Sequence, residues 1–192
     1  EFPHHQFAWK VLGAVLKQTG RIIESLTAMQ KSVQLAPQDA EAQNNLGVTL
    51  KELGRLDRAE ASYRKAISLK SDYAEAHNNL GITLKELGKL NEAEASFTHA
   101  IALKPDFAEA YSNLGNSLQE QGRLDEAEAS FTQAIALKPD FAEAYSNLGN
   151  SLQEQGRLDE AEASFTQAIA LKPDYAQAHN NLGITLKELG RL

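Results

Sequence analysis

Residues 108–141 read AEAYSNLGNSLQEQGRLDEAEASFTQAIALKPDF, and residues 142–175 repeat this stretch with one change at the last position. The preceding stretches are related to it in the same register, without insertion or deletion. A strict period of 34 residues indicates an array of small structural repeats. We therefore predict a single solenoid domain over residues 6–192, after an N-terminal extension or cloning remnant at 1–5. Its repeats are 6–39, 40–73, 74–107, 108–141 and 142–175, with a half repeat at 176–192.

The apolar residues of one repeat are spaced as in helices. Ala110, Leu114 and Leu118 recur every four residues, which places them on one face of a first helix. Gly122 follows them and suits the left-handed residue that ends a helix. The pattern DEAE at 125–128 has the spacing of a capping box, so it predicts the start of a second helix.

The second helix carries Ala127 and Phe131 on one face, and Pro139 ends it. Another capping-box pattern at 140–143 predicts the start of the next repeat, and Gly115 is small enough for two helices to approach closely. One helix pair cannot bury enough apolar surface alone, whereas stacked pairs bury a continuous core. The sequence thus predicts an all-α fold, a right-handed superhelical α-solenoid of antiparallel helix pairs.

The repeats resemble the tetratricopeptide repeat (TPR) family over residues 6–192. The family pattern has an aromatic residue or histidine at the fourth position, then Leu-Gly, and later a fixed series of Leu, Ala, Phe or Tyr, Ala and Pro. One repeat supplies it with Tyr111, Leu114, Gly115, Leu118, Ala127, Phe131, Ala134 and Pro139. Gln43 and Ser71 depart from the pattern in the repeat 40–73. The resemblance implies a protein–protein interaction module whose concave groove binds an extended peptide or a partner helix.

An asparagine stands at the sixth position of every repeat after the first, and helix geometry places this position off the apolar face. These residues are Asn45, Asn79, Asn113, Asn147 and Asn181. An Asn amide both donates and accepts, so a row of them could bind the backbone of a peptide whatever its side chains are. The row is similar to the asparagine ladder in the TPR arm of O-GlcNAc transferase. The alternative is that these amides make only local hydrogen bonds.

Neighbouring positions on the same face differ between repeats. Some repeats combine an amide with an apolar residue, and others are wholly polar, so a partner could bury apolar groups at the former and form hydrogen bonds at the latter. The additional predicted groove residues are Asn44, Asn78, Asn116, Asn150, Asn180, Val48, Ile82 and Ile184. Neutral drift between repeats would leave the same pattern.

Composition excludes several other functions. The chain has no cysteine, so disulfides and thiolate metal sites are ruled out, and its net charge of −7 argues against nucleic-acid binding. No apolar run is long enough for a membrane span, and no signal peptide is recognisable, so we expect a cytoplasmic location. We expect no cofactor, no metal site and no catalysis, because the serines and glycines recur with the period and belong to the scaffold.

The histidines fit the scaffold as well. His77 and His179 stand at the fourth position of their repeats, which predicts a packing role. His99 stands where later repeats have glutamine, which predicts an exposed side chain. His4 and His5 lack further ligands at helical spacing for a metal ion.

Three hypotheses on function remain open at this point. The first is a scaffold that binds a protein or peptide partner, and the acidic repeats 108–141 and 142–175 could favour a basic one. The second is self-association through the last helix, which lacks the second helix of its pair. The third is the non-catalytic TPR arm of a larger enzyme, such as a glycosyltransferase.

Overall fold

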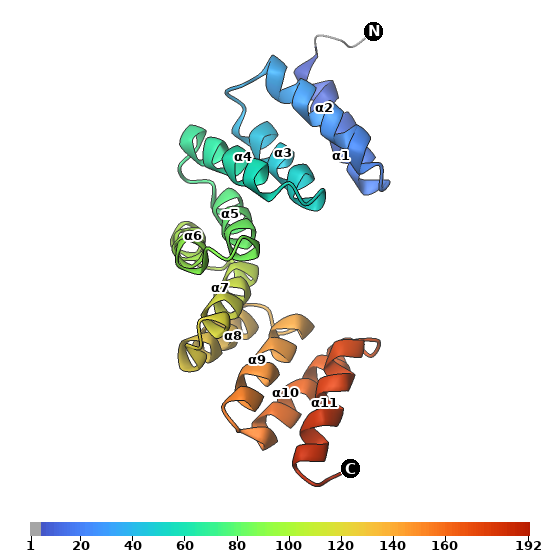
Figure 1. The fold of residues 1–192 in the computed structure, drawn as a ribbon, viewed down its shortest axis with the longest axis vertical. Helices are drawn as coiled ribbons and strands as arrows, with labels where there is room; N and C mark the ends of the chain where they lie inside the picture. The colour runs from blue at the N-terminus through green and yellow to red at the C-terminus, as the bar shows by residue number, and fades with distance from the viewer. Residues whose placement is uncertain (1–4) are drawn as a thin grey trace. The chain divides into compact units, whose positions relative to one another are not determined.

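The computed structural model describes residues 5–192, which form eleven helices and no strand over this range (Figure 1). Their bounds are α1 Gln6–Gln18, α2 Ile22–Leu35, α3 Ala40–Glu52, α4 Leu56–Leu69, α5 Ala74–Glu86, α6 Leu90–Leu103, α7 Ala108–Glu120, α8 Leu124–Leu137, α9 Ala142–Glu154, α10 Leu158–Leu171 and α11 Ala176–Glu188. Residues 1–4, most of the predicted N-terminal extension, lie outside the described range.

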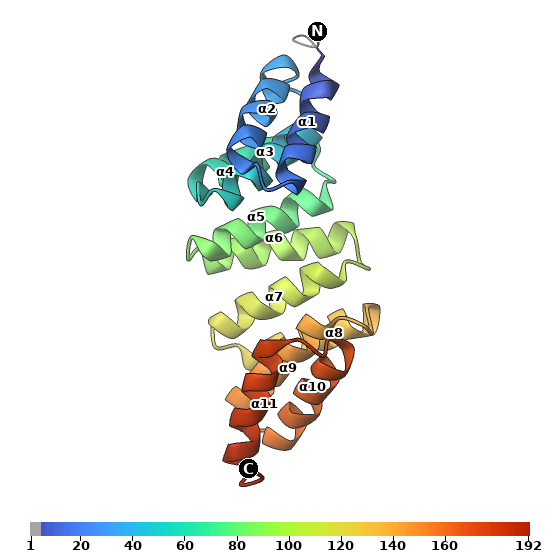
Figure 2. The same cartoon turned by 90° about the vertical axis from the view of Figure 1, so that its right-hand side faces the viewer.

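The helices belong to two compact units, an N-terminal unit that ends at Leu103 and a C-terminal unit from Lys104 to Leu192. Within each unit, every odd-numbered helix packs against the even-numbered helix that follows it, and each pair packs against the next helix along the chain. Figures 1 and 2 show this pairing for α1 with α2 and for α9 with α10. The predicted all-α solenoid of antiparallel helix pairs is confirmed. Its extent as one domain over residues 6–192 stays a prediction.

A glycine turn joins the two helices of each repeat. In the turn after α7, the backbone N–H of Gly122 donates to the carbonyl of Gln119 at 2.8 Å, and that of Arg123 donates to Leu118 at 3.0 Å. These two bonds define a Schellman motif, which needs a left-handed residue at its centre. Gly122 meets this need with φ of +75°, and glycine recurs with positive φ at the same place in each of the other repeats. The predicted helix end is therefore confirmed.

The predicted capping boxes are wrong. Helix α8 begins at Leu124 behind the N-cap residue Arg123, which makes no side-chain cap bond, so Asp125 already lies inside the first turn. Helix α9 likewise begins behind Phe141 without a side-chain cap. The Schellman motif explains why α8 lacks an acidic cap. Arg123 closes this motif and is also the N-cap residue of α8, so Asp125 cannot take the N-cap position. Carboxylates in a first turn still interact favourably with the helix dipole.

An aromatic ring from each of the second helices α4, α6, α8 and α10 fills the core beneath the first helix of the same repeat, and Met29 of α2 takes this position in the first repeat. The rings of Tyr63, Phe97, Phe131 and Phe165 are each 0 % exposed. A Cβ atom added to Gly115 would lie 2.6 Å from Cε1 of Phe131, so only glycine lets the two helices approach this closely. This close approach confirms the predicted role of Gly115 and fixes the orientation of α7 against α8.

Candidate peptide-binding surface

The predicted groove residues lie on the odd-numbered helices, and those of the N-terminal unit lie on α3 and α5. Asn44 and Asn78 are each only 6 % exposed, whereas Asn45 and Asn79 are half-buried. The Nδ2 group of Asn79 donates a hydrogen bond to Oδ1 of Asn44 at 3.1 Å. The side chains at the fifth and sixth positions thus connect one first helix to the next.

Asparagines of the C-terminal unit make a similar connection between α9 and α11. The Nδ2 group of Asn181 donates to Oδ1 of Asn150 at 2.6 Å. Oδ1 of Asn181 accepts from Gln177 at 2.9 Å and from Asn180 at 3.4 Å. Asn181 is 8 % exposed, so its amide is largely occupied within the protein.

The asparagines of the predicted ladder therefore differ in what they can offer a ligand. The side chains of Asn79 and Asn181 donate hydrogen bonds to the neighbouring first helix. This structural role corresponds to the alternative of local hydrogen bonding that was stated for the ladder. Asn45 and Asn147 are half-buried, and their side chains have no hydrogen-bond partner among residues 5–192. Because an amide has two donor hydrogens and an accepting oxygen, these two side chains retain their full capacity for a ligand.

The apolar members of the predicted set are most accessible on α11. Val48 and Ile82 are half-buried, whereas Ile184 is 44 % exposed. Ile184 and Asn180 help to line a pocket of about 490 Å³ on α11, together with Gly183 and Leu192. A Cβ atom added to Gly183 would have no neighbour within 4 Å, in contrast to Gly149 at the same repeat position, which faces Phe165.

A second row of contacts, which was not predicted from the sequence, joins the twelfth and thirteenth positions of successive repeats. In the N-terminal unit, Lys17 pairs with Glu52 at 3.2 Å and Lys51 pairs with Glu86 at 3.3 Å. In the repeats 108–141 and 142–175, glutamines replace the lysines, and Gln119 and Gln153 donate to the carboxylates of the next first helix. The sequence signal for these contacts was a Lys-Glu or Gln-Glu pair that recurs at the twelfth and thirteenth positions of the repeats.

This exchange of lysine for glutamine contributes to a difference in charge between the units. Residues 1–103 contain 12 basic and 12 acidic residues, whereas residues 104–192 contain 7 basic and 14 acidic residues. All of the net charge of −7 therefore belongs to the C-terminal unit. Of its carboxylates, Glu109 is paired with Lys138 at 2.9 Å, and this hydrogen bond lowers the pKa of Glu109 below its ordinary value.

Among residues 5–192, no three side chains of His, Asp or Glu lie close enough together to hold a metal ion. None of the helices described above combines the length and the apolar character that a bilayer-spanning segment requires.

Comparisons with known proteins give a consistent result. A family model described as Tetratricopeptide repeat matches residues 72–140, 106–174 and 140–192. Further models, described as TPR repeat and Tetratricopeptide repeat, match residues 49–88 and 28–61. No curated protein sequence matches the chain.

Several solved structures are similar over most of the chain. The crystal structure of MamA is 28 % identical with a TM-score of 0.75, and the match covers 86 % of this chain and 96 % of that one. TTC0263, a thermophilic TPR protein in Thermus thermophilus, is 26 % identical with a TM-score of 0.77, over 95 % and 99 % of the two chains. YrrB, a TPR protein with an unusual peptide-binding site, is 22 % identical with a TM-score of 0.70, over 90 % and 89 %.

Proposed function

Because the chain belongs to the tetratricopeptide repeat family, we propose that it is a protein-interaction scaffold that binds an extended peptide segment across the odd-numbered helices of a unit. The observation that carries this proposal is the pair of half-buried amides, Asn45 and Asn147, whose side chains form no hydrogen bond within residues 5–192. A partly buried amide without a partner is costly unless water or a ligand satisfies it. A peptide backbone, with one N–H and one C=O per residue, presents both of the required groups.

The arrangement of the helices within each unit supports an extended ligand. Consecutive first helices contact one another, as α3 does with α5 and α9 with α11. Packed helices lie about 8–10 Å apart, and an extended chain rises about 3.3 Å per residue. A bound strand that crosses the helices would therefore meet the same repeat position about once every three residues. Among the similar structures, YrrB is described as having a peptide-binding site.

The remaining groove residues would then divide into two roles. Asn44, Asn79, Asn150 and Asn181 hold neighbouring helices in place through their mutual hydrogen bonds. Val48, Ile82 and Ile184 would bury apolar side chains of the partner, and the net negative charge of the C-terminal unit favours a partner with basic residues. A cytoplasmic location stays a prediction.

The test begins with peptides selected on the wild-type protein from a display library of unrelated 12-residue sequences. Each selected peptide is then titrated by calorimetry against Asn147→Ala, Asn45→Ala and the double variant. Loss of one neutral hydrogen bond costs about 0.5–1.5 kcal/mol, so the substitution in the unit that binds a given peptide should weaken its binding about two- to tenfold. Because the amides would bind the backbone, peptides of different sequence should be weakened alike.

Gln133→Ala is the matched control, because Gln133 is an exposed amide on the second helix α8. This variant should bind every selected peptide as tightly as the wild type does. Circular dichroism checks that all variants keep their helices. Unchanged affinity of unrelated peptides for the double variant Asn45→Ala and Asn147→Ala would refute the role of these amides.

Self-association is a second candidate function, favoured by the open surface around Gly183 and the exposed Ile184. Ile184→Asn is an instructive variant, because Asn116 and Asn150 occupy the same position in the two preceding repeats. Light scattering should show a mass that rises with concentration for the wild type and stays monomeric for this variant. A constant monomer mass for the wild type over the whole range removes this candidate.

A further inference from the structure

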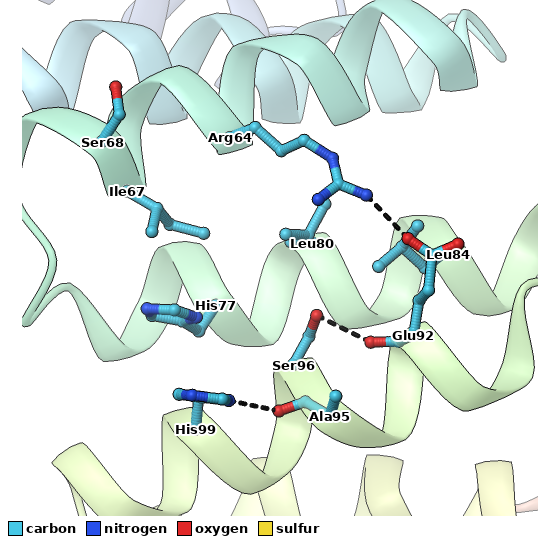
Figure 3. A pocket seen from close by; sticks show the side chains of 10 residues that line it. All are labelled: Arg64, Ile67, Ser68, His77, Leu80, Leu84, Glu92, Ala95, Ser96 and His99. Carbon is cyan, nitrogen blue, oxygen red and sulfur yellow. Dashed lines mark hydrogen bonds and ion pairs between the residues drawn. The ribbon is translucent and has the colours of Figure 1, made fainter.

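Two histidines from different helices of one repeat are stacked on the surface of the N-terminal unit. His77 of α5 and His99 of α6 have ring centroids 5.5 Å apart and ring planes inclined by only 11° (Figure 3). His77 is half-buried and His99 is exposed, so the expected packing role of the former and the exposure of the latter both hold. Their contact was not expected, because the two positions are 22 residues apart.

Backbone carbonyls fix the protonation sites of both rings. Nε2 of His77 lies 3.2 Å from the carbonyl oxygen of Ser71, and Nδ1 of His99 lies 2.8 Å from that of Ala95. A carbonyl oxygen only accepts hydrogen bonds, so each of these two nitrogens carries the proton in the neutral ring. The nitrogens left to bind a further proton are Nδ1 of His77 and Nε2 of His99.

The pair is not arranged to bind one metal ion. The lone pair of an imidazole nitrogen lies in the plane of its ring, so two ligands of one ion need planes that intersect at the metal. The ring planes of His77 and His99 are nearly parallel, and no third His, Asp or Glu completes a site with them among residues 5–192. Titration with protons is therefore the chemistry that this geometry allows.

The charged groups around the rings come from the helices on either side. The rings line a pocket of about 440 Å³ between α4, α5 and α6, whose charged members are Arg64 of α4 and Glu92 of α6. Arg64 is bound to Glu92 at 2.8 Å and to Glu60 at 2.9 Å, and Glu60 also pairs with Lys89. Because these four charges are paired with one another, none of them compensates a second positive charge on the imidazoles.

We propose that His77 and His99 form a pH-sensitive clasp between α5 and α6, closed when at most one ring is protonated and opened when both are. A single imidazolium can rest on the face of the neutral ring as a cation on a π system. Two imidazolium rings stacked at this distance repel each other, and one of them must turn away into solvent. The contact between the two helices is then lost at the surface.

The electrostatics of His77 agree with this order of events. Burial lowers the pKa of His77, the carbonyl of Ser71 raises it, and the neighbouring His99 lowers it further, with a net shift below the ordinary value of 6.5. The folded protein therefore binds fewer protons than the unfolded chain just below this pH. It follows that the stability supplied by the clasp is complete above about pH 6.5 and is lost as the pH falls.

Other repeats of the same chain provide internal references. Tyr111 with Gln133, and Tyr145 with Gln167, occupy the corresponding positions and contain no imidazole ring. His179 has the position of His77 and the same kind of carbonyl contact, to Pro173 at 2.9 Å. A response that depends on two stacked rings should therefore be confined to α5 and α6.

The test is an NMR titration of the histidine ring signals between pH 8 and pH 4.5 in the wild type, in His99→Gln and in His77→Tyr. Each substitution introduces a residue that the next repeats already have at that position, so folding is preserved. The wild-type pair should titrate in two steps about one pH unit or more apart, as coupled groups do. In His99→Gln, the pKa of His77 should rise, because the neighbouring ring that lowers it is removed. Equal, independent titration of both rings, with His77 unaffected by His99→Gln, overturns the proposal.

A thermal measurement tests the clasp apart from the ring signals. Between pH 7.5 and pH 5, the melting temperature of the wild type should fall by about 3 °C more than that of His99→Gln, the size of a modest destabilisation in a chain of this length. Amide hydrogen exchange at the lower pH should accelerate in α5 and α6 of the wild type and not in the variant. Equal losses in both proteins would contradict an opening of the clasp.

Discussion

Two glycines at the same position of successive repeats should respond in opposite directions to the same substitution. Gly149 of α9 faces the ring of Phe165, and an added Cβ atom would lie 2.6 Å from its Cε1 and 2.8 Å from Cδ1 and Cζ. Carbon atoms in contact are normally about 3.5–4.0 Å apart, so the ring would have to move by about 1 Å. Phe165 is 0 % exposed and therefore has no open side into which to move.

The expected magnitudes follow from these distances. Overpacking of this kind costs about 1–3 kcal/mol, and replacing glycine by alanine inside a helix returns about 0.8–1.0 kcal/mol. Given the severity of the contact, Gly149→Ala should lose roughly 1–2 kcal/mol of unfolding free energy. Gly183→Ala on α11 adds a Cβ with no neighbour within 4 Å, so it should gain up to about 0.8 kcal/mol.

Urea unfolding followed by circular dichroism measures both variants against the wild type. The two variants should differ by about 2–3 kcal/mol, although they make the same chemical change at the same repeat position. A double variant that combines Gly149→Ala with Phe165→Leu should relieve the clash, so the two substitutions should couple by at least about 1 kcal/mol. Equal effects of Gly149→Ala and Gly183→Ala would refute the packing argument.

Two further substitutions test particular contacts in the N-terminal unit. The hydroxyl of Tyr63 is buried without a hydrogen-bond partner, and phenylalanine stands at its position in the next three repeats, so Tyr63→Phe should stabilise the protein by about 1 kcal/mol in the same urea assay. Asp39 caps α3 by accepting from the backbone N–H of Ala42 at 3.0 Å, so Asp39→Ala should cost about 1 kcal/mol at pH 7. Burial raises the pKa of Asp39, but the bonds from Ala42 and Lys10 outweigh it and hold the pKa below 3.8, so this cost should disappear as the pH falls through the acid range. An unchanged difference at pH 2.5 would contradict the role of the ionised cap.

Most of the fold could be predicted from the sequence because it is built from local, repeated signals. The four-residue spacing of Leu114 and Leu118, the turn at Gly122 and the stop at Pro139 each act within a few residues of the chain. The capping boxes failed for a related reason. An acidic pattern such as 125–128 marks a helix start only approximately, and the Schellman motif moved the actual start to Leu124.

The candidate site was predicted less completely. The sequence placed the asparagines on one face of the first helices, but it could not show that Asn79 and Asn181 would bind the neighbouring helix while Asn45 and Asn147 would not. Each of these bonds joins residues 31 or 35 positions apart, and its existence depends on the rotation and spacing of two packed helices. The period alone gives the same environment to every copy.

The sequence by itself therefore determined the repeat, its two helices and the positions at which glycine must stand, because these follow from helical spacing and backbone sterics. Only the tertiary structure decided which side chains meet between helices. It paired His77 with His99 and separated structural amides from available ones. Such contacts depend on distances of a few ångströms between segments far apart in the chain, and the order of residues does not specify distances at that precision.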